Sequence, residues 1–192
     1  GNGDANALAT VRAVSTAVGP NVAIRVDANQ AWTYKQPLRM MKQIGDQVSV
    51  VEQPLPAKQV TELPMIRAQV QQAVMVDESV HSPEDAFQIL AASGADLINI
   101  KLQKPSGLFG AEQINTIAQS AGVGCMLGCM METKIGLGAA AHFCAAHANV
   151  RYVDLDAFLT YQAPSWLHGG FTNVGGQLTL SEAPGLGIEC DL

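Results

Sequence analysis

The sequence predicts an α/β protein whose parallel sheet curves into part of a (β/α) TIM-like barrel. Three short apolar runs end on the acidic residues Asp27, Glu52 and Asp77, and successive acids are 25 residues apart. A helical pattern lies between these runs, and no Gly-rich nucleotide fingerprint follows the first of them. Strands that alternate with helices pair in parallel, and an even repeat without that fingerprint favours a barrel over a doubly wound sheet.

The composition argues against several kinds of partner. The 192 residues are 48% hydrophobic and 15% charged, as in soluble globular proteins, and the formal net charge is −6. Binding to nucleic acid or to an anionic membrane surface would need a basic patch, which the sequence does not show. No apolar run is long enough to span a bilayer, and the N-terminus does not resemble a signal peptide. We therefore expect neither nucleic acid nor membrane as a partner.

The cysteines and the first residue indicate the setting of the chain. The four cysteines lack the paired spacing of a zinc site, and a chain of this length does not need a disulfide framework. They are Cys125, Cys129, Cys144 and Cys190. We expect reduced thiols and a cytoplasmic protein. Because the sequence starts at Gly1 and not at Met, we also expect a fragment or a processed piece.

Caps and breakers delimit the first units of the repeat. Gly19-Pro20 ends an opening helix, and Thr33 caps a second helix that Gly45 ends. The β-branched run between these helices, 22–27, is expected to be a buried strand. The next strand is expected over 48–52.

The later units follow the same pattern. A helix over 63–73 leads to the strand 74–77, and Ser82-Pro83-Glu84 opens the next helix. The run LINIK then forms a strand that ends on Lys101. The remaining expected elements are helices over 111–120 and 135–146 and strands over 122–127 and 150–154. Six strands fall short of the eight of a complete barrel.

The regular repeat stops before the C-terminus. We expect a partial barrel domain over residues 1–165. The segment 166–192 is rich in glycine and reads as loops and short strands, so it is expected to pack elsewhere than on the barrel wall.

The strand-end acids predict a metal site. All strands of a parallel barrel end at one face, so Asp27, Glu52 and Asp77 are expected to converge there. One acid at a strand end is usually a helix cap or a surface charge, but three at equal spacing favour a shared cation. Oxygen ligands without His or Cys select Mg²⁺, with Mn²⁺ as the alternative, over Zn²⁺. Such an ion stabilises the dianion formed when a proton leaves the carbon alpha to a substrate carboxylate.

Lys101 is the candidate acid or base for that proton. It ends the neighbouring strand, and a lysine beside a dication loses its own proton more readily. Lys104, three residues further on, is interpreted as a surface residue.

The segments DANQAW, VEQP, VDES and NIK together resemble the barrel domain of the enolase superfamily, in its muconate lactonizing enzyme subgroup. The resemblance covers nearly the whole chain and implies strands three to eight of a (β/α)7β barrel, without the N-terminal α+β capping domain. It implies that Asp27, Glu52 and Asp77 bind the metal and that Lys101 is the acid/base lysine.

The resemblance extends to residues beside the metal and the substrate. Asn29 and Asn99 lie where the family often has polar groups that support the ligands. Glu132 resembles the acid that ends the seventh strand, and we count it among the substrate-binding residues. The segment YVDLDAF resembles the Asp-x-Asp with which dipeptide epimerases of the L-Ala-D/L-Glu type hold the substrate's α-ammonium. Residues two apart in a strand point the same way, so Asp154 and Asp156 could bind one cation together.

One part of the family's pattern is outside this sequence. The second base of the family is the last lysine of a Lys-x-Lys, which the spacing puts immediately before Gly1. A 1,1-proton transfer needs a group on each face of the planar, Mg-stabilised enediolate. We therefore expect the parent protein to epimerise a dipeptide, and this chain alone to be inactive. The segment 166–192 is expected to return toward the capping domain, whose loops set the side-chain specificity.

Two other interpretations stay open. The parent could catalyse another reaction of the subgroup, as a cycloisomerase, an o-succinylbenzoate synthase or an N-acylamino acid racemase. The chain could instead be a non-catalytic, metal-binding remnant. A partial barrel leaves strand edges unpaired, and these invite association, so a homo-oligomer also remains open.

Overall fold

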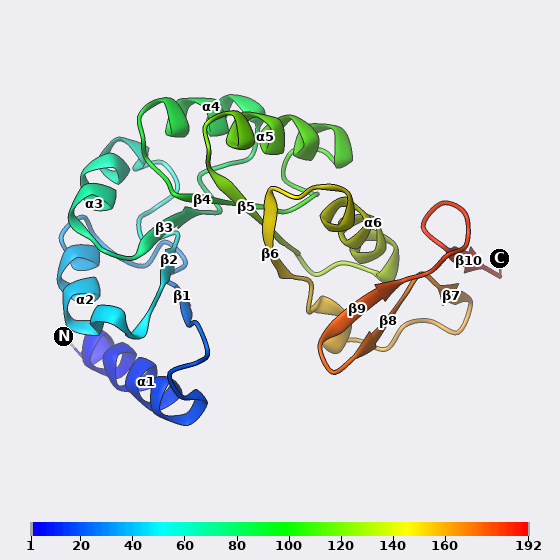
Figure 1. The fold of residues 1–192 in the computed structure, drawn as a ribbon, viewed down its shortest axis with the longest axis horizontal. Helices are drawn as coiled ribbons and strands as arrows, with labels where there is room; N and C mark the ends of the chain where they lie inside the picture. The colour runs from blue at the N-terminus through cyan, green and yellow to red at the C-terminus, as the bar shows by residue number, and fades with distance from the viewer. Residues whose placement is uncertain (1, 192) are drawn as a thin grey trace. The chain divides into compact units, whose positions relative to one another are not determined.

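The computed structural model describes residues 2–191 and divides into two compact units, Gly1–Ile98 and Asn99–Leu192. Figure 1 labels the helices and strands of both units.

Unit 1 alternates helices with parallel strands. Its elements are α1 (Asn2–Val18), β1 (Arg25–Asp27), α2 (Gln36–Ile44), β2 (Val50–Glu52), α3 (Leu63–Gln69), β3 (Ala73–Val76), α4 (Pro83–Ala91) and the start of β4 (Leu97–Ile100). Strand β2 pairs in parallel with β1 and with β3, and β3 pairs in parallel with β4. Helices α2 and α3 lie on one face of this row of strands (Figure 1). The alternation confirms the predicted order of elements.

Apolar faces and caps explain these elements. Met40, Met41 and Ile44 are buried on one face of α2, as the 3.6-residue period requires. Helix α4 begins after Ser82, as predicted, and a capping box holds its start. The Ser82 hydroxyl accepts from the Asp85 backbone N–H, and the Asp85 carboxylate accepts from the backbone N–H of Ser82. The buried face of α2 and the cap of α4 thus explain why these segments are helical.

Unit 2 continues with helices and parallel strands and then changes character. Its elements are α5 (Leu108–Ser120), β5 (Gly124–Gly128), α6 (Lys134–Ala146), β6 (Val150–Asp154), β7 (Leu167–Gly169), β8 (Phe171–Val174), β9 (Gln177–Leu180) and β10 (Ile188–Cys190). Strands β5 and β6 pair in parallel. The last four strands form two antiparallel pairs, β8 with β9 and β7 with β10. Helix α6 contacts β9 of the hairpin (Figure 1).

Several boundaries differ from those predicted. The first strand begins at Arg25 and not at Val22, because the Val22 side chain is 52% exposed and has no core to join. Helix α5 begins at Leu108, three residues before the predicted start at Ala111. Strand β6 has the predicted bounds.

The thiols agree with the sequence. All four cysteines are free, as predicted, and their exposure ranges from buried Cys125 to exposed Cys190. Within residues 2–191, no helix combines the length and the apolar character needed to cross a bilayer.

Candidate functional site

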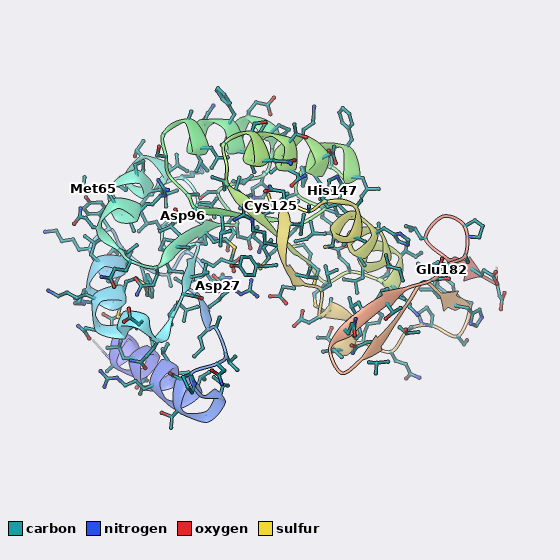
Figure 2. The ribbon with its side chains drawn as sticks, viewed as in Figure 1. Asp27, Met65, Asp96, Cys125, His147 and Glu182 are labelled. Carbon is teal, nitrogen blue, oxygen red and sulfur yellow. The ribbon has the colours of Figure 1, made fainter. Side chains whose placement is uncertain are left out.

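Two of the predicted metal ligands end neighbouring strands of unit 1. Asp27 is the last residue of β1 and Glu52 the last of β2, and the two are partners in the parallel register. The backbone N–H of Ala28 donates to the Glu52 carbonyl oxygen over 3.0 Å, so the pairing continues past the strand end. Asp27 is exposed (Figure 2), whereas Glu52 is only 7% exposed.

Asp77, the third predicted ligand, follows β3 directly. Its side chain is 2% exposed, and its carbonyl oxygen accepts from the Val80 N–H over 3.0 Å in a tight turn. A carboxylate buried to this degree is costly unless charged or polar groups offset the burial. Such a position is typical of a functional acid rather than of a surface charge.

Asn29 supports Asp27 directly. The Asp27 carboxylate accepts from the Asn29 backbone N–H over 2.7 Å and from its side-chain amide over 3.3 Å. Asn29 has a φ of 44°, in the left-handed region where a short polar side chain is tolerated better than most. The loop thus holds one carboxylate oxygen of Asp27 through a short hydrogen bond and the other oxygen through a longer one.

The donor set of unit 1 fits a hard divalent cation. Asp27, Glu52 and Asp77 offer only carboxylate oxygens, which suit Mg²⁺ and Mn²⁺. Strand register makes the first two neighbours, and Asp77 follows the next strand of the same row. Across the part of the chain that the structure describes, however, no three acidic, His or Cys side chains are gathered closely enough to form a metal-binding group. The support for a divalent cation therefore comes from the ligand type of these three acids and from their places at successive strand ends.

Lys101 and Asn99 belong to unit 2. Lys101 follows β4 directly and is half-buried, and its carbonyl oxygen accepts from the Lys104 N–H over 2.9 Å. The interpretation of Lys104 as a surface residue is wrong, because Lys104 is half-buried and its Nζ donates to the Asn99 carbonyl over 3.0 Å. Asn99 itself is 2% exposed and packs against Gly128, where a Cβ would lie 2.7 Å from its Oδ1. A side chain at position 128 would therefore displace Asn99.

The predicted substrate-binding acids of unit 2 surround a thiol. The Cys129 Sγ lies 3.9 Å from an Asp156 carboxylate oxygen. Burial, and then the negative charges of Asp156, Glu132 and Asp154, raise the pKa of this thiol. The Cys129 thiol therefore loses its proton at a higher pH than an exposed cysteine does.

Glu132 is held by the loop between β5 and α6. It is 7% exposed, and its carboxylate accepts from the Met130 backbone N–H over 3.1 Å. Gly136 makes room for it, because a Cβ there would lie 2.5 Å from the other carboxylate oxygen. Glu132 is thus a fixed acid rather than a solvated one.

Asp154 and Asp156 line one cavity of about 520 Å³ in unit 2. Its walls are largely apolar and come from α6, β6, the 3-10 turn Ala157–Leu159 and the β8–β9 hairpin, with Ala141, Phe158 and Leu178 among them. The prediction that Asp154 and Asp156 point the same way along one strand is wrong for Asp156. Strand β6 ends at Asp154, and Asp156 has a helical backbone before the short 3-10 turn Ala157–Leu159. Both residues still line the cavity, Asp154 from the end of β6 and Asp156 from the residue before the 3-10 turn.

Two residues of these sites were missed by sequence reasoning. Gln53, which follows Glu52, is fully buried and bonds to the loop after β3. Cys129 contacts Asp156 across 27 residues of sequence. The only signal for Gln53 was its place directly after a strand-end acid, and Cys129 gave none beyond its place in the loop after β5.

The family follows from comparison with known proteins. Residues 2–192 match the family described as Enolase C-terminal domain-like, so the chain belongs to this family. An L-Ala-D/L-Glu epimerase of Bacillus subtilis (strain 168) is 40% identical over 184 residues, which are 94% of this chain and 50% of the relative. Muconate cycloisomerase 1-1 of Acinetobacter lwoffii is 34% identical over 183 residues, covering 94% of this chain and 48% of the relative. The chain thus spans about half the length of these curated relatives.

A solved structure gives the same result for the fold. The dipeptide epimerase from Enterococcus faecalis V583, complexed with Mg and the dipeptide L-Leu-L-Tyr, superposes with a TM-score of 0.92 at 40% identity. The match covers 97% of this chain and 53% of that one. The predicted fold class, an α/β protein with an incomplete (β/α) TIM-like barrel, is confirmed.

Proposed function

We propose that the protein carrying this chain is a metal-dependent dipeptide epimerase of the L-Ala-D/L-Glu type, which acts by 1,1-proton transfer. The family and the names of the relatives support an isomerase of the enolase superfamily. The Mg-bound dipeptide complex of the E. faecalis enzyme supports both the metal and the substrate class.

Asp27, Glu52 and Asp77 hold the divalent cation in this proposal. The support is their oxygen-only donor set and their places at the ends of successive parallel strands. When bound, Mg²⁺ supplies positive charge to the substrate carboxylate while the alpha proton leaves. Asn29 keeps the Asp27 carboxylate oriented through its two hydrogen bonds.

Lys101 moves the proton on one face of the substrate. It directly follows β4, as Asp77 directly follows β3, and its ammonium or amine is the one group we assign to the alpha carbon. The group for the second face is expected outside this chain, as the family resemblance implies.

Asp154 and Asp156 bind the α-ammonium of the dipeptide. The observation that carries this assignment is that both carboxylates line one mostly apolar cavity. Both side chains are exposed, and two carboxylates that face one cavity offer charge-assisted hydrogen bonds to an ammonium group. An apolar wall also suits the uncharged side chain of a residue such as alanine.

The main alternative is a cycloisomerase, which the 34% identity with the Acinetobacter enzyme supports. Muconate has no ammonium, so the two reactions differ in their need for Asp154 and Asp156. Removing one charge-assisted bond costs about 1.5–3 kcal/mol, so we expect Asp154→Asn and Asp156→Asn each to raise the KM for L-Ala-L-Glu about 10-fold or more.

The experiment measures epimerisation of L-Ala-L-Glu and turnover of cis,cis-muconate by the full-length protein. Glu182→Gln, an exposed acid outside the cavity, is the control and should match the wild type (Figure 2). Muconate turnover that is indifferent to both Asn variants, with no dipeptide activity, would establish the cycloisomerase instead.

The setting of the enzyme is proposed as well. Four free thiols fit a reducing cytoplasm. We also propose that the segment 166–192, with its two antiparallel strand pairs, packs toward the capping domain of the full-length protein.

A further inference from the structure

The side chain of Gln53 joins two of the loops that carry the proposed metal ligands. Its Oε1 accepts from the backbone N–H of Asp77 over 2.9 Å and from that of Ser79 over 3.2 Å. Its Nε2 donates to the Leu55 carbonyl and to the Ser79 hydroxyl, each over 2.8 Å. The amide thus uses all its hydrogen-bonding groups in binding the loop after β2 to the loop after β3.

The backbone of Gln53 is held in a conformation that glutamine rarely adopts. Its φ is 33°, in the left-handed region. Its N–H donates to the Met75 carbonyl of β3 over 2.9 Å, and its carbonyl accepts from the Gln30 N–H over 2.9 Å. Strain of this kind persists only where the surroundings over-determine the conformation, and it is concentrated at functional sites.

Gln30 extends the same connection to the loop after β1. It has a φ of 64°, and its Oε1 accepts from the Ala57 N–H over 3.0 Å. Its Nε2 donates to Glu78 over 3.1 Å, and the Ser79 hydroxyl donates to the Ala57 carbonyl over 3.0 Å. The loops that follow Asp27, Glu52 and Asp77 are therefore connected through the two glutamines.

We propose that Gln53 is a positioning residue that sets the Glu52 and Asp77 carboxylates for a divalent cation; this inference rests on the proposed metal site. Glu52 directly precedes Gln53 in the chain, and the backbone N–H of Asp77 is bonded to the Gln53 amide. Beyond the strand pairing of β2 and β3, this amide therefore ties the backbone of Asp77 to the residue next to Glu52. A residue of this kind acts through the ligands and does not touch the metal.

The test compares Gln53→Met with Gln72→Met in the full-length protein. Gln72 is also buried, at 6% exposure, and its Nε2 donates to the Gly45 carbonyl over 2.7 Å, but it precedes β3, whereas Asp77 follows that strand. Both changes remove hydrogen bonds from a buried glutamine, so both should lower the Tm. Only Gln53→Met should weaken binding of Mn²⁺, measured by titration with electron paramagnetic resonance, by about tenfold or more.

A milder variant keeps the test decisive if Gln53→Met does not fold. Ser79→Ala removes the hydroxyl that accepts from Gln53 and donates to Ala57, while the amide keeps its bond to Asp77. Its Mn²⁺ affinity should lie between those of the wild type and Gln53→Met. If Gln53→Met does not fold, an affinity of Ser79→Ala equal to that of the wild type would overturn the inference.

The outcomes separate this inference from the proposed function. Wild-type protein that binds no Mn²⁺ would overturn the metal site and the inference together. Wild-type protein that binds Mn²⁺, with Gln53→Met within about twofold of it, would overturn the positioning role and leave the metal site standing. An equal loss of affinity in Gln72→Met would also overturn it, because general loss of stability would then explain both.

Discussion

Asp27 and Glu52 form the last register pair of the parallel strands β1 and β2, with one carboxylate exposed and the other buried. Neighbouring strands lie about 4.8 Å apart, so the two acids leave the sheet side by side. Two like charges side by side repel each other, and a cation bound between the carboxylates would offset this repulsion. The first prediction follows from this pair.

Neutralising any proposed ligand should weaken metal binding. Asp27→Asn, Glu52→Gln and Asp77→Asn each remove a negative oxygen ligand, so we expect each to lower Mg²⁺ affinity by about 100-fold or more, judged from the 10- to 100-fold effects of mere supporting residues. Isothermal titration of the full-length protein with Mg²⁺ measures this. Asp46→Asn, an exposed acid in the turn before β2, should bind as the wild type does. Unchanged affinity in the three ligand variants would refute the assignment.

Removal of the Lys101 amine should abolish chemistry without abolishing metal binding. We expect Lys101→Met to lower the epimerisation rate of the full-length protein by about 10²- to 10⁴-fold, the usual contribution of a general acid or base. Mg²⁺ affinity should stay near that of the wild type, because Lys101 is no ligand. Lys58→Met, at an exposed position, is the control. A Lys101→Met protein with normal turnover would exclude the assigned role.

A methyl group at Gly128 should disturb Asn99. The added Cβ would lie 2.7 Å from the Asn99 Oδ1 and 3.0 Å from its Nδ2, so Gly128→Ala should destabilise the protein by about 1–3 kcal/mol. In helix α1, a Cβ at Gly3 meets no atom within 4 Å, and Gly3→Ala should instead be neutral or slightly stabilising. Thermal unfolding compares the two variants. Equal Tm values would show that the pocket of Asn99 yields without cost.

Alkylation should distinguish the thiols by burial. Burial raises the pKa of Cys125 to about 12 and that of Cys144 to about 11, so both remain protonated at pH 8. Iodoacetamide should modify exposed Cys190 first and leave buried Cys125 until the protein unfolds, as mass spectrometry of the peptides would show. The unfolded chain releases these two thiol protons at a lower pH than the folded chain does. The free energy of unfolding should therefore fall as the pH rises from the ordinary thiol range toward 11 and 12. Early labelling of Cys125 would contradict this.

The strand ends could be predicted from sequence because local signals coincide there. Apolar β-branched residues stop and an acid follows, so Asp27, Glu52 and Asp154 each end the predicted strand in the structure. The starts of elements were less certain, because burial decides them. Val22 has strand propensity but is exposed, and β1 begins after it.

The connections between loops could not be predicted, because they depend on partners far away in sequence. Gln53 bonds to Asp77 and Ser79, which lie 24 and 26 residues further along the chain. Strand alternation predicts that Asp156 points the same way as Asp154, but the strand ends at Asp154 and the backbone is helical at Asp156. In both cases the sequence shows which residue follows the strand, but only the fold determines which groups its side chain contacts.

In the proposed reaction, Lys101 exchanges the alpha proton of a dipeptide with the help of a divalent cation that the strand-end acids hold. The most direct measurement is NMR of L-Ala-L-Glu in D₂O with the full-length protein, with and without Mg²⁺. We predict deuterium at the Glu alpha carbon and both epimers with Mg²⁺, and no exchange without it. No exchange with any dipeptide, together with turnover of an N-acylamino acid or of a cyclohexadiene acid, would contradict the account and leave Asp154 and Asp156 without their proposed role.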